Sequence, residues 1–91
     1  MNQDVKKRVS QRLKIIEGQV RGLHKKIDED AYCIDIITQA SAIRHALGSL
    51  EDVVLENHLE TCVVTQMQGT GKNQDKAVSE ILSVYKLAKK K

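Results

Sequence analysis

The side chains of this sequence best suited to chemistry are two thiols and an imidazole, those of Cys33, Cys62 and His58. Thiolates and imidazoles bind soft and borderline metal ions, so the chemistry they indicate is metal binding. On a helix that turns about 100° per residue, the steps from Cys33 to His58 and to Cys62 both return to within about 20° of the starting direction. The three side chains would therefore project from one side of a single helix. At about 1.5 Å per residue, however, His58 would lie about 37 Å from Cys33 along the helix axis. One copy of the helix cannot close a site around one ion.

A second copy that runs in the opposite direction would complete the site. If two such helices pair about a two-fold axis near Ala46 and Leu47, Cys33 of one copy lies beside His58 and Cys62 of the other. Symmetry then gives two equivalent sites per pair. Small residues near the axis would let the helices approach closely: Ala42, Ala46 and Gly48. The ligand positions therefore predict an antiparallel dimer.

The composition of the ligand set narrows the choice of metal. His58 and Cys62 are four residues apart, so they are adjacent on a helix surface and could hold one ion together. Two thiolates and one imidazole favour Cu(I), which is soft and accepts a low coordination number, over hard cations. Zn(II) is the main competitor, although a structural zinc site usually has a fourth protein ligand. A lone buried cysteine is more often a small apolar residue than a ligand, so the interpretation of Cys33 depends on the other two residues.

The elements that must position these residues are helices. Apolar residues recur at steps of three and four in three stretches, the sequence contains no proline, and no stretch shows the alternation of a strand. We expect a single all-α domain over residues 1–91, a three-helix protomer with helices at about 4–27, 29–68 and 74–89. The second helix, roughly forty residues long, would have to pack along another long helix.

Length and composition limit the class of protein. A chain of 91 residues without Phe or Trp has a thin aliphatic core and usually needs a partner, often a second copy of itself. No apolar run is long enough to cross a bilayer and the N-terminus lacks an apolar signal segment, so we expect a cytoplasmic protein without a membrane partner. No nucleophile–base pair and no phosphate loop is visible, so we expect neither an enzyme nor a small-molecule substrate.

The charges are unevenly distributed along the chain. Residues 1–28 contain eight basic and three acidic residues, residues 29–68 one basic and seven acidic, and residues 69–91 six basic and two acidic. Basic first and last segments favour contact with a polyanion, and a solvated basic face without a partner is the alternative.

Several motifs make the chain similar to the copper-sensing repressor (CsoR) family of bacteria. They are RL at 12–13, EGQVRGL at 17–23, YCIDI at 32–36 and H-x-x-x-C at 58–62. The resemblance covers nearly the whole chain and implies antiparallel helical-bundle dimers that pair into a disc-like homotetramer. It also implies transcriptional repression, in which the metal-free protein binds operator DNA and is released by Cu(I), so that copper homeostasis genes are controlled.

Sensors of other inducers share this fold, and the ligand residues distinguish among them. The nickel and cobalt type has an additional N-terminal His and a His in place of Cys62, the persulfide type has Cys in place of His58, and the formaldehyde type uses a proline that this sequence lacks. Cys33, His58 and Cys62 match the copper type at all three positions. The remaining alternatives are a sensor of zinc, persulfide or formaldehyde with the same fold, and a copper-buffering protein without DNA activity.

The resemblance also implies roles for residues around the site and at the DNA. Tyr32 and Glu80 are the expected partners of the second ring nitrogen of His58, because outer partners orient a ligating imidazole. Four residues are the expected DNA contacts, of which the first two are principal: Arg12, Arg44, Lys14 and Arg21. Since no helix-turn-helix is visible, we expect contacts to phosphates and DNA shape more than to base edges.

Overall fold

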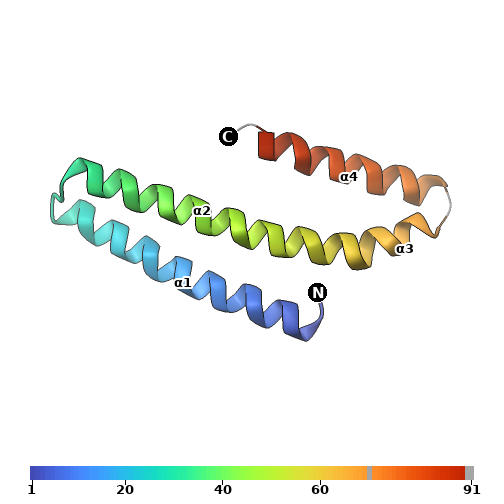
Figure 1. Ribbon diagram of the computed structural model, residues 1–91, viewed down its shortest axis with the longest axis horizontal. Helices are drawn as coiled ribbons and strands as arrows, with labels where there is room; N and C mark the ends of the chain where they lie inside the picture. The colour runs from blue at the N-terminus through green and yellow to red at the C-terminus, as the bar shows by residue number, and fades with distance from the viewer. Residues whose placement is uncertain (70, 90–91) are drawn as a thin grey trace. The chain divides into compact units, whose positions relative to one another are not determined.

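Helices make up nearly all of the computed structural model, which describes residues 1–69 and 71–89 without the side chains of Cys62, Val63 and Lys89. Their order is α1 (Gln3–Asp28), α2 (Cys33–His58), η1 (Leu59–Val63), α3 (Val64–Met67) and α4 (Gly71–Lys89), with α2, η1 and α3 consecutive in one helical run (Figure 1). No strand occurs in these two ranges, so the predicted three-helix, all-α fold is confirmed. The chain divides into two compact units, Met1–Glu56 and Asn57–Lys91.

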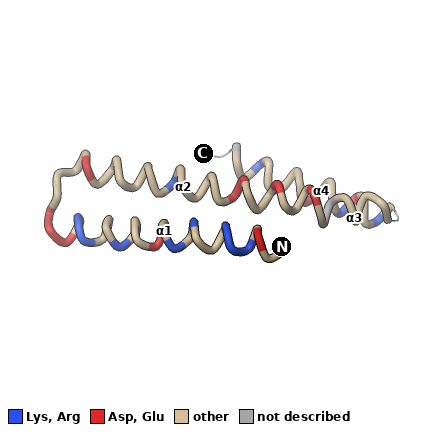
Figure 2. Tube along the Cα trace, turned by 60° about the horizontal axis from the view of Figure 1, so that its bottom comes forward, with Lys and Arg blue, Asp and Glu red and all other residues tan. Residues whose placement is uncertain are grey.

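The first unit is a helical hairpin. Its first helix, α1, begins with an N-cap, because the Asn2 side-chain oxygen accepts a hydrogen bond from the Val5 amide at 2.8 Å. Within the unit, α1 and α2 lie side by side and run in opposite directions (Figures 1 and 2). Ile16 of α1 and Ile43 of α2 are its buried apolar side chains, at 5% and 7% exposure. The pattern of apolar residues therefore produces two packed helices with a thin aliphatic core.

The second helix was expected to begin at residue 29, but a turn occupies this position and α2 begins later. Asp30 has a positive φ of 54°, and the amides of Asp30 and Ala31 donate to the carbonyls of Ile27 and Lys26 at 3.1 and 2.9 Å. This is a Schellman-type C-cap, in which one left-handed residue lets the last carbonyls of a helix find partners. Since that conformation ends α1 and cannot continue as a helix, α2 begins at Cys33. Asp30 therefore ends the first helix and is not part of the second.

Replacing Asp30 with Gly should raise the free energy of unfolding by roughly 0.5–1 kcal/mol, because glycine adopts a left-handed conformation without the Cβ clash. Urea unfolding followed by circular dichroism would measure this. As a control, Asp28→Gly places glycine at the last residue of α1, which does not need a positive φ, and should lower the free energy of unfolding. Equal destabilisation by both substitutions would contradict the role assigned to Asp30.

The second unit contains the end of the long helical run and α4. Here α3 packs against α4, where Ala77 is completely buried and the Gln74 side-chain amide donates to the Met67 carbonyl oxygen at 2.9 Å. Helix α4 begins at Gly71, three residues earlier than expected. The amides of a first helical turn have no partner within the helix, so a glycine there costs less than in a helix interior.

Residues 29–68 were expected to form one α-helix. The long helical run is instead interrupted by a segment that is not α-helical. Leu59–Val63 form a π-helix, a rare form that occurs often at functional sites. The hydroxyl of Thr61 donates to the Asn57 carbonyl oxygen at 2.8 Å, and that of Thr65 donates to the Thr61 carbonyl oxygen at 3.0 Å. Such bonds to the preceding turn often bend helices slightly. The same bonds at Thr38 and Ser83 lie in regular α-helix, so they do not by themselves explain the π-helix.

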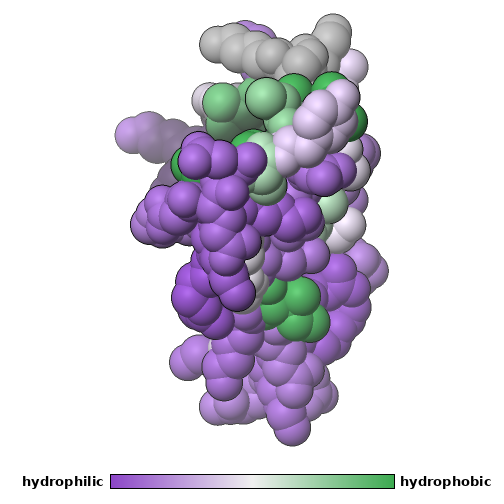
Figure 3. Space-filling view, turned by 90° about the vertical axis from the view of Figure 1, so that its left-hand side faces the viewer, coloured by the Kyte–Doolittle hydropathy of each residue, from purple (hydrophilic) through white to green (hydrophobic). Residues whose placement is uncertain are grey.

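Both units leave apolar side chains uncovered. Half-exposed residues follow one line on α1, seven residues apart: Leu13, Val20 and Ile27. Others lie on α2: Ile34, Ile37 and Leu47. Figure 3, seen from the side of the α1–α2 turn, shows apolar surface among mainly hydrophilic side chains. Because exposed apolar area of this kind marks interaction surfaces, the units present faces that suit a partner.

None of the helices in the described ranges is both long enough and apolar enough to cross a membrane.

Candidate metal centre

Cys33 is the first residue of α2, and its thiol is free and exposed. The preceding carbonyl, that of Tyr32, accepts the amides of Asp35 at 2.9 Å and Ile36 at 3.2 Å, which fixes the first turn of the helix. Tyr32 itself is 71% exposed. The thiol therefore lies in a hydrogen-bonded first turn of α2, where a solvent ion or a second chain can reach it.

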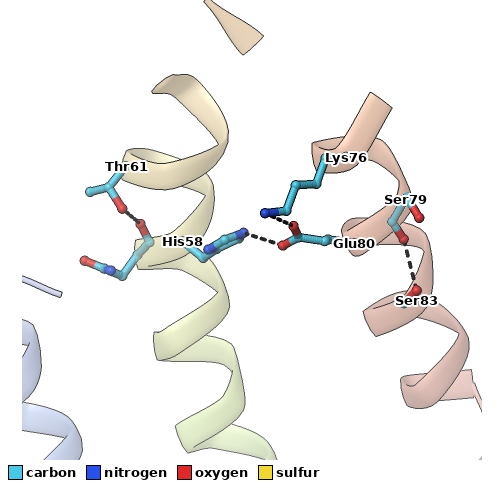
Figure 4. A network of polar contacts seen from close by, with 7 residues as sticks. His58, Thr61, Lys76, Ser79, Glu80 and Ser83 are labelled. Carbon is cyan, nitrogen blue, oxygen red and sulfur yellow. Dashed lines mark hydrogen bonds and ion pairs between the residues drawn. The ribbon is translucent and has the colours of Figure 1, made fainter. Parts of the chain in front are cut away.

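His58 is the last residue of α2 and belongs to the second unit. Its Nε2 lies 3.9 Å from Oε2 of Glu80 on α4, with the two side chains 33% and 41% exposed (Figure 4). The distance is within the range of an ion pair but longer than a hydrogen bond. Since this contact uses Nε2, Nδ1 is the ring nitrogen left to bind a metal.

Glu80 is shared between two partners. Its other carboxylate oxygen, Oε1, lies 3.9 Å from Nζ of Lys76, one turn earlier on α4 (Figure 4). The sequence interpretation did not include Lys76, although its spacing of four residues from Glu80 is the usual signal for such a pair. The carboxylate that faces the histidine is thus also within ion-pair distance of a lysine.

The structure does not bring the predicted ligands together within the described part of one chain. Cys33 and His58 stand at opposite ends of the 26 residues of α2, a length of about 37 Å in an α-helix. Cys62 lies in the π-helix η1, and its side chain is outside the described residues. No group of three His, Cys, Asp or Glu side chains suited to a metal ion occurs among the residues that the structure describes.

The predicted DNA contacts lie on two helices and all are exposed. Arg12, Lys14 and Arg21 belong to α1, along which basic residues recur, and Arg44 belongs to α2 (Figure 2). Within the described ranges none of the four takes part in an ion pair. Their charges are therefore available to an external anion or to another chain.

Sequence similarity places the chain among metal-responsive regulators. Residues 5–86 match the profile of a family described as metal-sensitive transcriptional repressors. The chain is 40% identical over 82 residues to the copper-sensing transcriptional repressor CsoR of Bacillus subtilis (strain 168), covering 89% of this chain and 78% of that protein. It is 42% identical over 71 residues to the copper-sensing transcriptional repressor RicR of Mycobacterium tuberculosis (strain ATCC 25618 / H37Rv), covering 78% and 74%.

A solved structure agrees with these relatives. The crystal structure of the copper-sensing repressor CsoR with Cu(I) from Geobacillus thermodenitrificans NG80-2 matches with a TM-score of 0.85 and 34% identity. The match covers 96% of this chain and 88% of that chain. The protein belongs to the family of metal-sensitive transcriptional repressors.

Proposed function

We propose that the protein is a Cu(I)-responsive transcriptional repressor of the cytoplasm, which binds operator DNA when metal-free and is released when Cu(I) binds. Residues 1–91 would act as one sensing and DNA-binding domain. The observation that carries the proposal is the set of soft and borderline donors Cys33, His58 and Cys62, with Nε2 of the histidine 3.9 Å from Oε2 of Glu80. Relatives that are themselves named copper-sensing repressors support it.

The site would be completed by a second copy of the chain. Cys33 from one copy would join His58 and Cys62 from an antiparallel copy, giving two sites per dimer. The free, exposed thiol at one end of α2 and the uncovered apolar residues of the hairpin support this pairing. The family resemblance extends it to a homotetramer.

The donors fit Cu(I) in number and type. The thiolates of Cys33 and Cys62 and Nδ1 of His58 would supply three donors to Cu(I), whereas a structural zinc site would need a fourth ligand. Bound Cu(I) supplies a soft cationic centre that these donors share. Glu80, which lies 3.9 Å from Nε2 of the imidazole, would orient the ring while Nδ1 binds the metal.

DNA binding would depend on the basic residues of α1. Arg12, Lys14 and Arg21 are exposed and unpaired in the described chain, so they can contact phosphates. Metal can change the affinity for DNA only if the two bind different states of the protein with different affinities. The link between His58 on the long helical run and Glu80 on α4 is a contact that could differ between such states.

Metal-free protein should bind a fragment of its own upstream promoter region in a gel-shift titration, and one Cu(I) per chain should weaken binding by roughly 5–150-fold. Zn(II), a persulfide donor and formaldehyde serve as parallel additions. Release by one of these but not by Cu(I) would identify a sensor of another inducer. Copper binding without any DNA binding would instead indicate a buffering protein.

A further inference from the structure

The face of α2 that begins at Cys33 continues as a regular stripe. Its members, which we call the α2 stripe, alternate at steps of four and three: Cys33, Ile37, Ala40, Arg44, Leu47, Glu51 and Val54. All of them are exposed except Val54, which is half-buried. Such a spacing keeps one face of a helix towards a second helix over its whole length. The α2 stripe lies within the first unit, whose own hairpin leaves it uncovered.

Two residues of the α2 stripe are charged, and their signs are opposite. Arg44 and Glu51 stand on either side of Leu47, and in the described chain neither takes part in an ion pair. Seven residues separate them by about 10.5 Å along the helix, which is too far for an ordinary ion pair within the helix. A charge in a seam that becomes buried is destabilising unless it is paired. Their partners must therefore come from the chain that covers the stripe.

An antiparallel second copy supplies these partners by symmetry. Arg44 and Glu51 are centred on the point between Leu47 and Gly48, and so are Cys33 and Cys62. The register that places Cys33 level with Cys62 of the second copy therefore places Arg44 level with Glu51 of the second copy, and the reverse. A parallel pair would bring Arg44 against Arg44. The charges favour one direction and one register.

We infer that Arg44 and Glu51 form two symmetry-related ion pairs between antiparallel α2 helices, and that these pairs set the register at which Cys33 meets the ligands of the second copy. Of the proposed function, the inference requires only the antiparallel dimer, and it does not depend on copper sensing or on DNA binding. It gives Arg44 a role between subunits in place of the DNA contact that the family resemblance implies. A residue on the dimer seam is covered by the second copy and has no free charge to offer a phosphate.

Complementary charge reversals test the inference. Arg44→Glu alone places two carboxylates against each other at each ion pair, and Glu51→Arg alone places two guanidinium groups there. Each variant should therefore dimerise at least about tenfold more weakly than the unaltered protein. A one-to-one mixture of the two variants forms mixed dimers. In these dimers, each of the two ion-pair positions again holds one acidic and one basic side chain. Sedimentation equilibrium over a concentration series should show that the mixture recovers most of the lost affinity.

The control is Asp52→Arg, which makes the same change of charge one residue further along, about 100° around the helix from Glu51. Mixed with Arg44→Glu, it should not restore dimerisation as Glu51→Arg does. Circular dichroism checks that each variant is helical, and the milder Arg44→Gln and Glu51→Gln variants replace any that is not. We expect each of these variants to lose free energy of dimerisation. In the double variant, the loss should be smaller than the sum of the two single losses.

The outcomes separate this inference from the proposed function. If the unaltered protein dimerises and releases DNA with Cu(I), but the complementary mixture is no better than either variant, the ion pairs are wrong and the sensor stands. If Arg44→Gln dimerises normally and loses only DNA binding, Arg44 is a DNA contact. A chain that stays monomeric at every concentration would overturn both the dimer and the ion pairs.

Discussion

Mixing two variants that each lack part of the ligand set should restore Cu(I) binding that neither shows alone. Cys33→Ala removes the thiol at the start of α2, and the double substitution His58→Ala with Cys62→Ala removes the ligands at and after its other end. Each variant paired with itself contains no complete site. An antiparallel pair of one of each contains one complete site, because the intact Cys33 of one copy meets the intact His58 and Cys62 of the other.

Both the affinity and the capacity of the mixture should change by predictable amounts. Loss of an outer partner of a metal ligand costs about 10–100-fold in affinity, so loss of a ligand itself should cost more than about 100-fold. If the copies pair at random, about half of the dimers in an equal mixture are mixed and each holds one site of two, which gives about a quarter of the full capacity. Anaerobic titration against a chromophoric Cu(I) chelator measures both quantities.

The control is a mixture of the two deficient variants whose subunits have not been allowed to exchange, which should bind no more Cu(I) than either variant alone. If the variants still bind no Cu(I) after exchange, the ligands are not shared between antiparallel chains. Tight binding by Cys33→Ala alone would remove Cys33 from the site. Either result would contradict the arrangement on which the sensor depends.

The helices were predictable because their apolar residues recur at the helical period and no proline interrupts them. The end of α1 was not, because acidic residues can cap the helix that follows or end the one that precedes. Asp30 takes the second role by adopting a positive φ, which glycine and asparagine signal more clearly than aspartate. The π-helix η1 was also missed, because hydroxyl-to-carbonyl bonds like those of its threonines occur in the regular α-helices of this chain as well.

Part of the candidate site could also be predicted from the sequence, and part of it could not. The types and spacing of Cys33, His58 and Cys62 identify potential ligands, because metal preference is a property of the side chains themselves. The contact between His58 and Glu80 depends instead on how α4 packs against the long helical run, so only a structure supplies its distance. The spacing of the ligands on one helix predicts that a second copy completes the proposed site, but the fold of a single chain does not show that pairing.

Glu80→Ala should leave Cu(I) binding largely intact and remove most of the Cu(I)-induced release of DNA. The carboxylate contacts the imidazole of His58 at Nε2 and leaves Nδ1 to the metal, so the substitution removes no ligand. We expect a loss of about tenfold or less in Cu(I) affinity, the low end for an outer partner, because the contact is long and partly exposed. We also expect release by Cu(I) to fall from roughly 5–150-fold to a few-fold at most.

A selective effect on release has a thermodynamic reason. Only an interaction that differs between the DNA-binding and released states can couple the two ligands, whereas an interaction present equally in both changes stability alone. Glu80 joins the ligand-bearing helical run to α4, so it is placed to differ, and Asp75→Ala removes an equal charge from α4 without touching His58. Gel-shift titrations with and without Cu(I), beside chelator competition, separate affinity from coupling. Normal release by Glu80→Ala, or equal loss of release by Asp75→Ala, would show that the signal passes through other contacts.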